Sequence, residues 1–192
     1  MITYRDGTPI PEVTDQTEWL NLTTGACSYY DNDPTKTRLY NWYAVMGIHD
    51  AASLSDVTLR KEFAPEGWHV PSDAEWTTLE NHLIANGYNY DGTTTGNKIA
   101  KAMASTSGWN SFLTTGAVGN DQSLNNSSGF NAFPEGIRTS TFSSEGYLAH
   151  FWSSTEDGTD YAMTSYLDVN RSDLSRAGYF AYYGYSVRFV RD

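Results

Sequence analysis

The stretch "SDAEWTTLENHLIANG", residues 72–87, contains the clearest signal for regular structure in the chain. Ser72 followed three residues later by Glu75 is a capping box, in which the two side chains satisfy each other's backbone N–H groups at the start of a helix. Apolar side chains then recur at helical spacing: Trp76, Leu79 and Leu83. Gly87 supplies a stop. The sequence therefore predicts a helix over 73–85.

Two weaker helical patterns lie on either side of this stretch. "DPTKTRLYNWYAVMG" (33–47) has Pro34 at a permitted first-turn position and Gly47 as a terminator. "GNKIAKAMAS" (96–105) predicts a shorter third helix. In the first of them, Leu39, Tyr43 and Met46 would line one face.

Later segments have the period of strands. "HFWSST" (150–155) and "YSVRFV" (185–190) alternate between apolar and polar residues. Between them and the main helix, residues 87–129 are dominated by Gly, Ser, Thr and Asn, which predicts long, irregular loops. Helices in the first half and strands in the second predict the α+β class. The length of 192 residues predicts a single domain over 1–192.

The charge balance excludes several classes of partner. Lys and Arg total 12 against 23 Asp and Glu, a net charge of −11. No basic stripe is present to displace counterions from phosphates, so neither nucleic acid nor an anionic membrane surface is an expected partner. No apolar run is long enough for membrane insertion, and the first residues lack the pattern of a signal peptide.

No catalytic constellation is evident. The four histidines lie outside known motifs, and His69 and His150, each beside an aromatic residue, are interpreted as structural. Cys27 is the only cysteine, so no internal disulfide forms, and it is interpreted as a core residue. Asp31 and Asp33 give a weak calcium signal, but a solvated turn is the preferred interpretation. No metal or cofactor is predicted.

Residues 157–185 have an unusual composition. Six of these 29 residues are Tyr, and Lys, Glu, Gln and Trp do not occur. In "RAGYFAYYG" (176–184) neither a period of 2 nor one of 3.6 separates an inner from an outer face. Tyr with Ser, Gly, Asn and Asp is the composition of an antibody paratope, in which Tyr supplies rigid contact area. This favours a binding surface over core packing.

Ordered motifs along the chain resemble those of a known family. They are "GACSYYDND", "RLYNWYAV", "APEGWHVPSDAEWTTLENHL", "GFNAFPEGIR", "FWSSTE" and "GYSVRFVRD". Together they resemble the Fibrobacter succinogenes major paralogous domain family. The resemblance implies a C-type-lectin-like fold of the formylglycine-generating-enzyme type, with two helices, a small mixed or antiparallel sheet, long irregular loops and pairing of the N- and C-terminal strands. The catalytic cysteines of that enzyme type are not available, because this chain has Cys27 alone.

The end of the chain also resembles the variable proteins of diversity-generating retroelements, which mutate adenines in a copied repeat. Asn codons altered in this way yield Tyr, Ser, Asp and Gly but never Lys, Glu, Gln, Met or Trp. Residues 168–186 obey that exclusion, and Met163 is its one violation after Asp157. The resemblance implies a constant scaffold over 1–156 and 186–192 and a variable region over 157–185.

Diversified positions are expected to be exposed and clustered on one face, because a position that accepts both Gly and Tyr is unsuited to a core. The predicted ligand-binding residues are Asp157, Asp160, Tyr161, Thr164, Tyr166, Asp168, Asn170, Arg171, Asp173, Ser175, Gly178, Tyr179, Phe180, Tyr182, Tyr183 and Tyr185. Scaffold tryptophans are expected to be buried: Trp68, Trp76, Trp109 and Trp152.

The function expected from these features is non-catalytic binding of a host-cell surface protein or glycan. The resemblance implies display on a phage tail fibre or a bacterial surface appendage, as a homo-oligomer or attached to a larger fibre. A carbohydrate-binding module of a gut bacterium is the first alternative, and an enzyme of unknown reaction is the least favoured.

Overall fold

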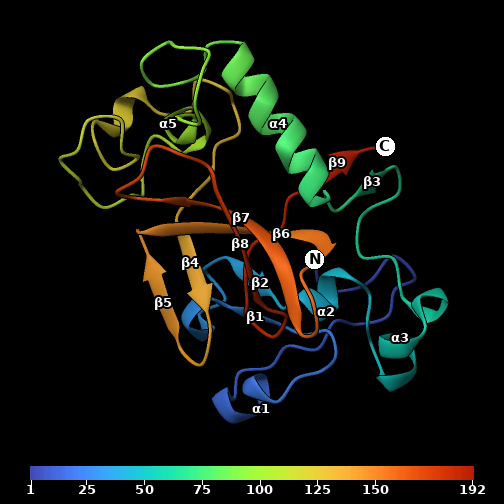
Figure 1. Cartoon of the computed structure of the whole chain (residues 1–192). Helices are drawn as coiled ribbons and strands as arrows, with labels where there is room; N and C mark the ends of the chain where they lie inside the picture. The colour runs from blue at the N-terminus through green and yellow to red at the C-terminus, as the bar shows by residue number, and fades with distance from the viewer.

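The computed structural model describes all 192 residues and combines helices with sheet, which confirms the α+β class (Figure 1). Its longest helix, α4 (Asp73–Ala85), has the predicted bounds. The capping box is formed: the Ser72 hydroxyl accepts from the Glu75 N–H, and a Glu75 carboxylate oxygen accepts from the Ser72 N–H at 2.8 Å. This part of the fold is specified by residues three positions apart.

A five-stranded sheet forms the centre of the molecule, with the order β5-β4-β6-β7-β8. Its strands are β4 (Glu135–Arg138), β5 (Phe142–Glu145), β6 (Leu148–Glu156), β7 (Tyr161–Asp168) and β8 (Ser175–Phe180). β4 and β6 pair in parallel, and the other neighbours are antiparallel. The strand predicted over 150–155 is confirmed as part of β6, and β8 is an edge strand.

The remaining elements are short. They are α1 (Gln16–Leu20), β1 (Cys27–Tyr29), η1 (Tyr30–Asn32), β2 (Arg38–Tyr40), α2 (Trp42–Val45), α3 (Ala51–Ser55), η2 (Val57–Leu59), β3 (Trp68–His69), α5 (Ala100–Met103), η3 (Gln122–Leu124) and β9 (Val190–Arg191). β1 pairs with β2, and β3 pairs with β9, each as a two-stranded sheet. None of the helices is both long and apolar enough to cross a bilayer.

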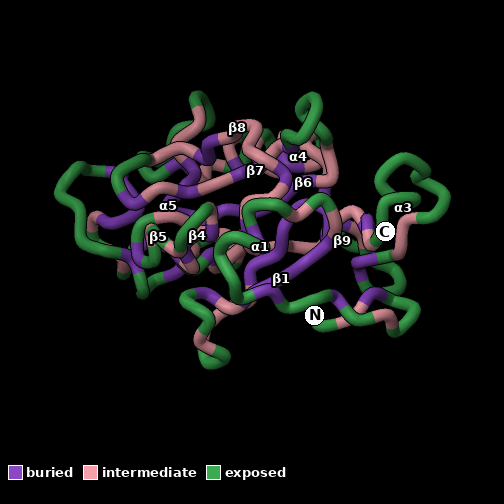
Figure 2. Tube along the Cα trace, turned by 90° about the horizontal axis from the view of Figure 1, so that it is seen from below, coloured by how far each residue is buried: buried purple, intermediate pink, exposed green.

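Two apolar cores lie on opposite faces of the central sheet. α4 covers one face, while the N-terminal elements with β1, β2 and α2 cover the other (Figure 1). Adjacent residues of β6 serve different cores: Phe151 packs with Trp76 of α4, and Trp152 packs with Trp42 of α2. Buried chain runs through the strands and exposed chain through the outer loops (Figure 2).

The helix predicted over 33–47 is largely wrong. Arg38–Tyr40 instead forms β2, because pairing with Cys27–Tyr29 buries Leu39 completely. Only Trp42–Val45 is helical, and Asn41 begins this turn by accepting hydrogen bonds from the N–H groups of Ala26 and Ala44. Non-local pairing therefore overrode the local helical pattern. The short third helix is confirmed as α5.

The C-terminal strand also differs from the prediction. Tyr185 and Ser186 make single bridges to Tyr40 and Phe151, and the chain then leaves the central sheet to form β9 beside β3. Val187 packs on the core, but Val190 is 36% exposed. The implied pairing of the terminal strands is absent because β3 is the partner of β9.

The same pairing explains one exposed tryptophan. Trp68 lies in the two-residue strand β3 opposite β9 and is 42% exposed, contrary to expectation. The other three scaffold tryptophans are buried as predicted: Trp76, Trp109 and Trp152.

Buried polar side chains hold the loops between α4 and β4 in place through hydrogen bonds to the backbone. The Asn125 amide donates to the carbonyls of Ser105 and Val118 at 2.9 and 3.2 Å. The Lys101 ammonium, almost fully buried, donates to the carbonyl of Asn120. These bonds satisfy backbone groups that no strand or helix pairs, which is how irregular chain is kept compact.

Candidate functional site

The candidate site lies on the β7–β8 hairpin, on the face of the sheet away from α4. Side chains on alternate residues of a strand share a face. The register pairs Tyr166 with Ser175 and with His150 of β6, and Ala162 with Tyr179. Tyr166, Tyr179 and His150 therefore lie on the same face of the sheet. The buried Trp152, two residues after His150 in β6, lies on this face as well.

An inner layer of rings supports this face. The buried His150 imidazole stacks on Tyr166 with ring centroids 4.4 Å apart and on Tyr185 at 4.6 Å. Tyr185 in turn lies 4.6 Å from the ring of Trp152 and is completely buried. This layer connects the hairpin to the N-terminal core.

An outer layer of half-exposed rings continues from it. Tyr179 contacts Tyr166 and Tyr183 with centroids 6.3 Å apart in each case. Phe180 contacts Tyr183 at 5.7 Å and Tyr161 at 4.4 Å. We call this continuous set the tyrosine surface: Tyr161, Tyr166, Tyr179, Phe180, Tyr182 and Tyr183.

The electrostatics of the rings follow from their burial. Burial lowers the pKa of His150 to about 3, so its imidazole is neutral, and its Nδ1 has no hydrogen-bond partner. Burial, followed by the neighbouring Tyr166, raises the pKa of Tyr179. Burial, followed by Tyr183, raises that of Tyr182. The tyrosine surface is therefore made of uncharged aromatic rings, most of which also carry hydroxyl groups.

A polar cleft lies at one end of the tyrosine surface, where β7 turns into β8. Its volume is about 360 Å³. Arg171 donates two hydrogen bonds to Asp173 at 2.9 and 3.0 Å, and Ser175 donates to the same carboxylate. Tyr166 forms part of the wall.

The second cleft, of about 310 Å³, lies at the opposite end beside the β6–β7 turn. Asp160 and Tyr161 line it together with Trp42 and Tyr43 of α2. Asp157 projects from the same turn onto β8, where its carboxylate lies so close to Gly178 that a Cβ there would be 1.7 Å from it. The turn is thus packed against the edge strand.

The predicted ligand-binding residues differ in exposure. Exposed side chains are Asp157, Asp160, Tyr161, Asn170 and Arg171. Half-buried ones are Tyr166, Asp168, Asp173, Gly178, Tyr179, Phe180, Tyr182 and Tyr183. The hairpin brings the aromatic ones together and places the polar ones in the turns at its two ends.

Three of the predicted residues are buried, contrary to expectation. Tyr185 packs between His150 and Trp152, as described above. Thr164 faces Trp152 and donates to the carbonyl of Ala177 at 3.1 Å, and Ser175 is covered where it bonds to Asp173. Thr164 and Ser175 lie on the same face of the hairpin as Tyr166, so their burial reflects short side chains that neighbouring groups cover, while the longer Tyr166 side chain stays half-exposed.

Sequence reasoning interpreted His150 as structural without giving it a place in the site, and it missed Arg176. His150 proves to be the centre of the inner ring layer, and its place beside Phe151 and Trp152 in a predicted strand was the available signal. Arg176 points toward α4, where its guanidinium contacts Thr77 and lies 3.3 Å from the Asp73 carboxylate. No local pattern identifies that contact.

His69 and the acidic turn at Asp33 have structural roles. His69 bonds to Asp192 and Glu75 at 2.7 Å each, which confirms its structural interpretation. The Asp33 carboxylate accepts hydrogen bonds from the N–H and hydroxyl of Thr35, as expected of a turn. No group of three or more His, Cys, Asp or Glu side chains is placed to hold a metal ion. Cys27 is buried, as predicted.

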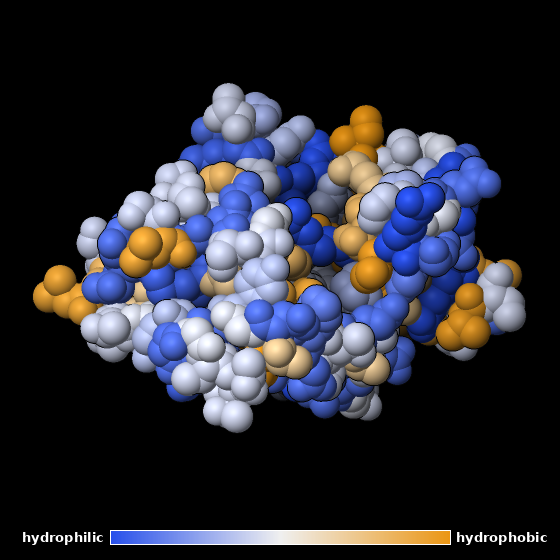
Figure 3. All heavy atoms as spheres, turned by 90° about the horizontal axis from the view of Figure 1, so that it is seen from above, coloured by the Kyte–Doolittle hydropathy of each residue, from blue (hydrophilic) through white to orange (hydrophobic).

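Apolar side chains outside the site are dispersed. On the α4 side of the molecule they form separate groups within a mainly hydrophilic surface (Figure 3). Two of the most exposed apolar side chains, Leu113 and Leu124, lie in the loops before β4. The tyrosine surface, by contrast, is a continuous cluster of partly exposed aromatic rings.

The fold and this surface define an α+β domain with an aromatic face on an edge hairpin. The chain belongs to the Fibrobacter succinogenes major domain family, whose model matches residues 1–191. Neither a curated protein nor a solved structure matches it.

Proposed function

We propose that this protein is a non-catalytic binding module that uses the tyrosine surface to hold a protein on the surface of a host cell. The observation that carries the proposal is the unbroken run of half-exposed rings from Tyr166 to Tyr161. The rings rest on a buried layer, so they present contact area that is already ordered before binding.

Such a surface is suited to protein recognition. Tyr combines a large apolar ring with a polar tip and loses little entropy on binding, which is why aromatic residues dominate interface hot spots. Half-burial of each ring fixes its rotamer but leaves one edge or face free. The ring hydroxyls, neutral because burial raises the pKa of Tyr179 and Tyr182, supply donors and acceptors at the rim.

We further propose that this surface is diversified by a retroelement and displayed on a phage tail fibre or bacterial surface appendage, within a C-type-lectin-like fold. The residue composition of 157–185 supports diversification. The buried positions Thr164, Ser175 and Tyr185 are then the ones in which substitutions are restricted. The neighbouring genes test this part: a reverse-transcriptase gene and a near-identical template repeat are expected, and their absence would contradict diversification.

The binding test compares matched tyrosine variants. Labelled wild-type protein is applied to a panel of intact gut bacterial cells and to a glycan array. We expect binding to particular cells, and we expect the double variant Tyr161→Ser/Tyr182→Ser to lose that binding. Thermal unfolding is measured on the same preparations, and a small shift is expected because both side chains are at the outer edge of the cluster.

Tyr147→Ser is the matched control. Tyr147 is 52% exposed in the turn before β6, and it makes no contact with the tyrosine surface. This variant should bind as the wild type does. Equal binding by the double variant, or equal loss in the control, would refute the role of the tyrosine surface.

A glycan is the second candidate ligand, favoured by the polar cleft of about 360 Å³ beside Tyr166. An aromatic ring next to carboxylate, guanidinium and amide groups suits a sugar, whose faces are apolar and whose edges carry hydroxyls. Glu80, Asn97 and Arg176 supply those groups. Saturable binding on the array that is lost in Tyr166→Ala but kept in Tyr161→Ser/Tyr182→Ser would favour this candidate.

A further inference from the structure

The cleft at the Tyr161 end of the tyrosine surface differs chemically from the cleft at the Tyr166 end. Its floor is apolar, formed by Ile48 and Ala181, and aromatic rings of Trp42, Tyr43 and Tyr161 contribute to its walls. At about 310 Å³ it lies at the lower end of the range for small-ligand pockets, roughly 300–1,000 Å³. This space suits a single side chain or a small ligand.

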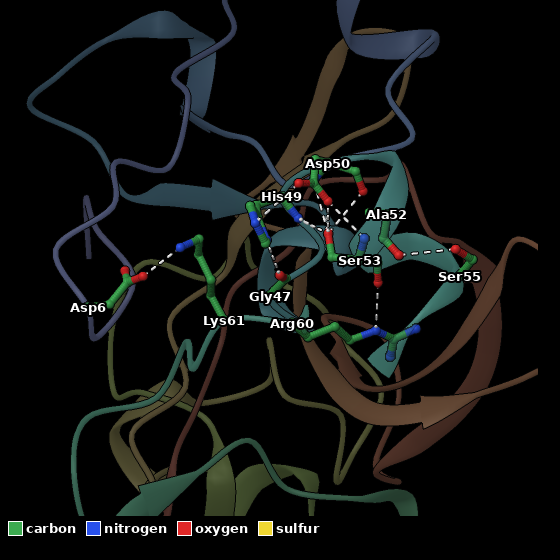
Figure 4. Close-up of polar contacts among 9 residues, drawn as sticks. All are labelled: Asp6, Gly47, His49, Asp50, Ala52, Ser53, Ser55, Arg60 and Lys61. Carbon is green, nitrogen blue, oxygen red and sulfur yellow. Dashed lines mark hydrogen bonds and ion pairs between the residues drawn. The ribbon is translucent and has the colours of Figure 1, made fainter. Parts of the chain in front are cut away.

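Two carboxylates border the cleft, and only one of them has a partner within the chain. The Asp160 carboxylate accepts no hydrogen bond and forms no ion pair within the chain. Glu156 has only Arg60 within reach, at 3.9 Å. Arg60 is itself held back, because its Nε donates to the carbonyl of Ser53 at 3.2 Å in the capped turn of α3 (Figure 4).

A hydroxyl without a partner in the chain is also available at the cleft. Tyr43 is 5% exposed and lines the cleft, yet its hydroxyl makes no hydrogen bond within the chain. Burial, followed by the nearby Asp160 carboxylate, raises the pKa of Tyr43, so this hydroxyl stays protonated and uncharged at neutral pH. The hydroxyl oxygen itself is reached by solvent, so it is available to a ligand that enters the cleft.

We infer that this cleft receives a cationic side chain, a lysine or arginine of the bound protein. Asp160 supplies the opposite charge, the Tyr43 hydroxyl accepts a hydrogen bond, and the aromatic walls pack on the aliphatic stem and attract the cation through their faces. The inference rests on the proposed function in that it identifies the partner as a protein with a basic residue at the edge of its interface.

The test uses the full chain alone, without a partner. Nα-acetyl-lysine methylamide and Nα-acetyl-arginine methylamide are titrated into the protein and followed by heteronuclear NMR. Nα-acetyl-citrulline methylamide is the matched uncharged probe. We expect saturable shifts at the amides of Gly158, Asp160 and Ala181 with the two cationic probes, and no saturable shift with citrulline.

Substitutions of the Asp160 carboxylate and of the Arg60 cation should change the affinity for the arginine probe in opposite directions. Asp160→Asn should weaken binding of the arginine probe roughly tenfold, equivalent to about 1.4 kcal/mol. Asn also tolerates the left-handed backbone of this position, where φ is 61°. Arg60→Gln removes the competing cation and should tighten binding about threefold, as expected for a partly exposed charge.

Asp31→Asn is the control, because Asp31 is exposed, has a similar left-handed backbone with φ of 56°, and does not line the cleft. It should leave the probe's affinity unchanged. Equal shifts with citrulline, or equal affinities for Asp160→Asn and wild type, would overturn the inference. Those results would leave the cell-binding test of the tyrosine surface unaffected, because that test changes Tyr161 and Tyr182 and needs no cationic probe.

Discussion

The two faces of the β6–β7 pair show how one sheet is used in two ways. On the α4 face, Phe151 and Leu167 are sealed beneath Trp76. On the opposite face, Trp152 and Tyr185 are equally buried, but the rings above them, such as Tyr179, are only half-covered. The first face is closed within the chain, and the second ends in a layer of rings that is partly open to solvent.

This difference shows that burial separates scaffold from candidate binding residues better than residue type does. Tyr185 and Tyr182 lie three positions apart, both within the tyrosine-rich stretch. One is part of the inner ring layer and the other of the outer layer.

Truncation of either sealed tryptophan should have the largest effect on stability. Trp76→Ala and Trp152→Ala each remove a buried ring and leave a cavity, so each should lower the free energy of unfolding by about 3–5 kcal/mol. Urea unfolding at constant temperature measures the loss. A loss below about 1 kcal/mol for either variant would mean that the corresponding face is not sealed.

Tyr185→Ala and Tyr182→Ala should differ in their effect on stability, although both residues lie in the tyrosine-rich stretch. Tyr185→Ala should lower the free energy of unfolding by about 3 kcal/mol or more, because its ring fills the space between His150 and Trp152. Tyr182→Ala should lower it by less, about 1 kcal/mol, because part of its ring is already in water. Similar losses in the two variants would remove the distinction between inner and outer layers.

The smallest expected effect is a dependence of stability on pH through His69, which joins α4 to the chain beyond β9. Hydrogen bonds to Asp192, then to Glu75, raise the pKa of His69 above its usual 6.5. A raised folded-state pKa stabilises the fold fully below pH 6.5, and that stabilisation is lost as the pH rises through the folded-state pKa. Melting temperatures of wild type should therefore fall slightly over this interval.

His69→Gln should remove this slope while leaving the rest of the pH profile in place. Gln keeps a hydrogen-bonding side chain but does not titrate, so it is a matched replacement. A variant with the same slope as the wild type between about pH 6 and 8 would assign the dependence to another group.

Local signals explain which parts of the fold were predictable. The capping box and apolar spacing of 72–87 act between residues three or four positions apart, and α4 has the expected bounds. The alternation over 150–155 likewise placed β6 correctly. The composition of 157–185 indicated that the hairpin carries an aromatic surface, and the structure brings most of those rings together.

Tertiary structure alone decided the rest, because those features depend on contacts between distant segments. Pairing with Cys27–Tyr29 turned part of a helical pattern into β2, and pairing with β3 drew the last residues away from the central sheet. The same holds for the tyrosines: the sequence by itself determined that they are many and close together. Which of them are buried was set by the register of β7 against β6 and by the position of His150 and Trp152 beneath Tyr185.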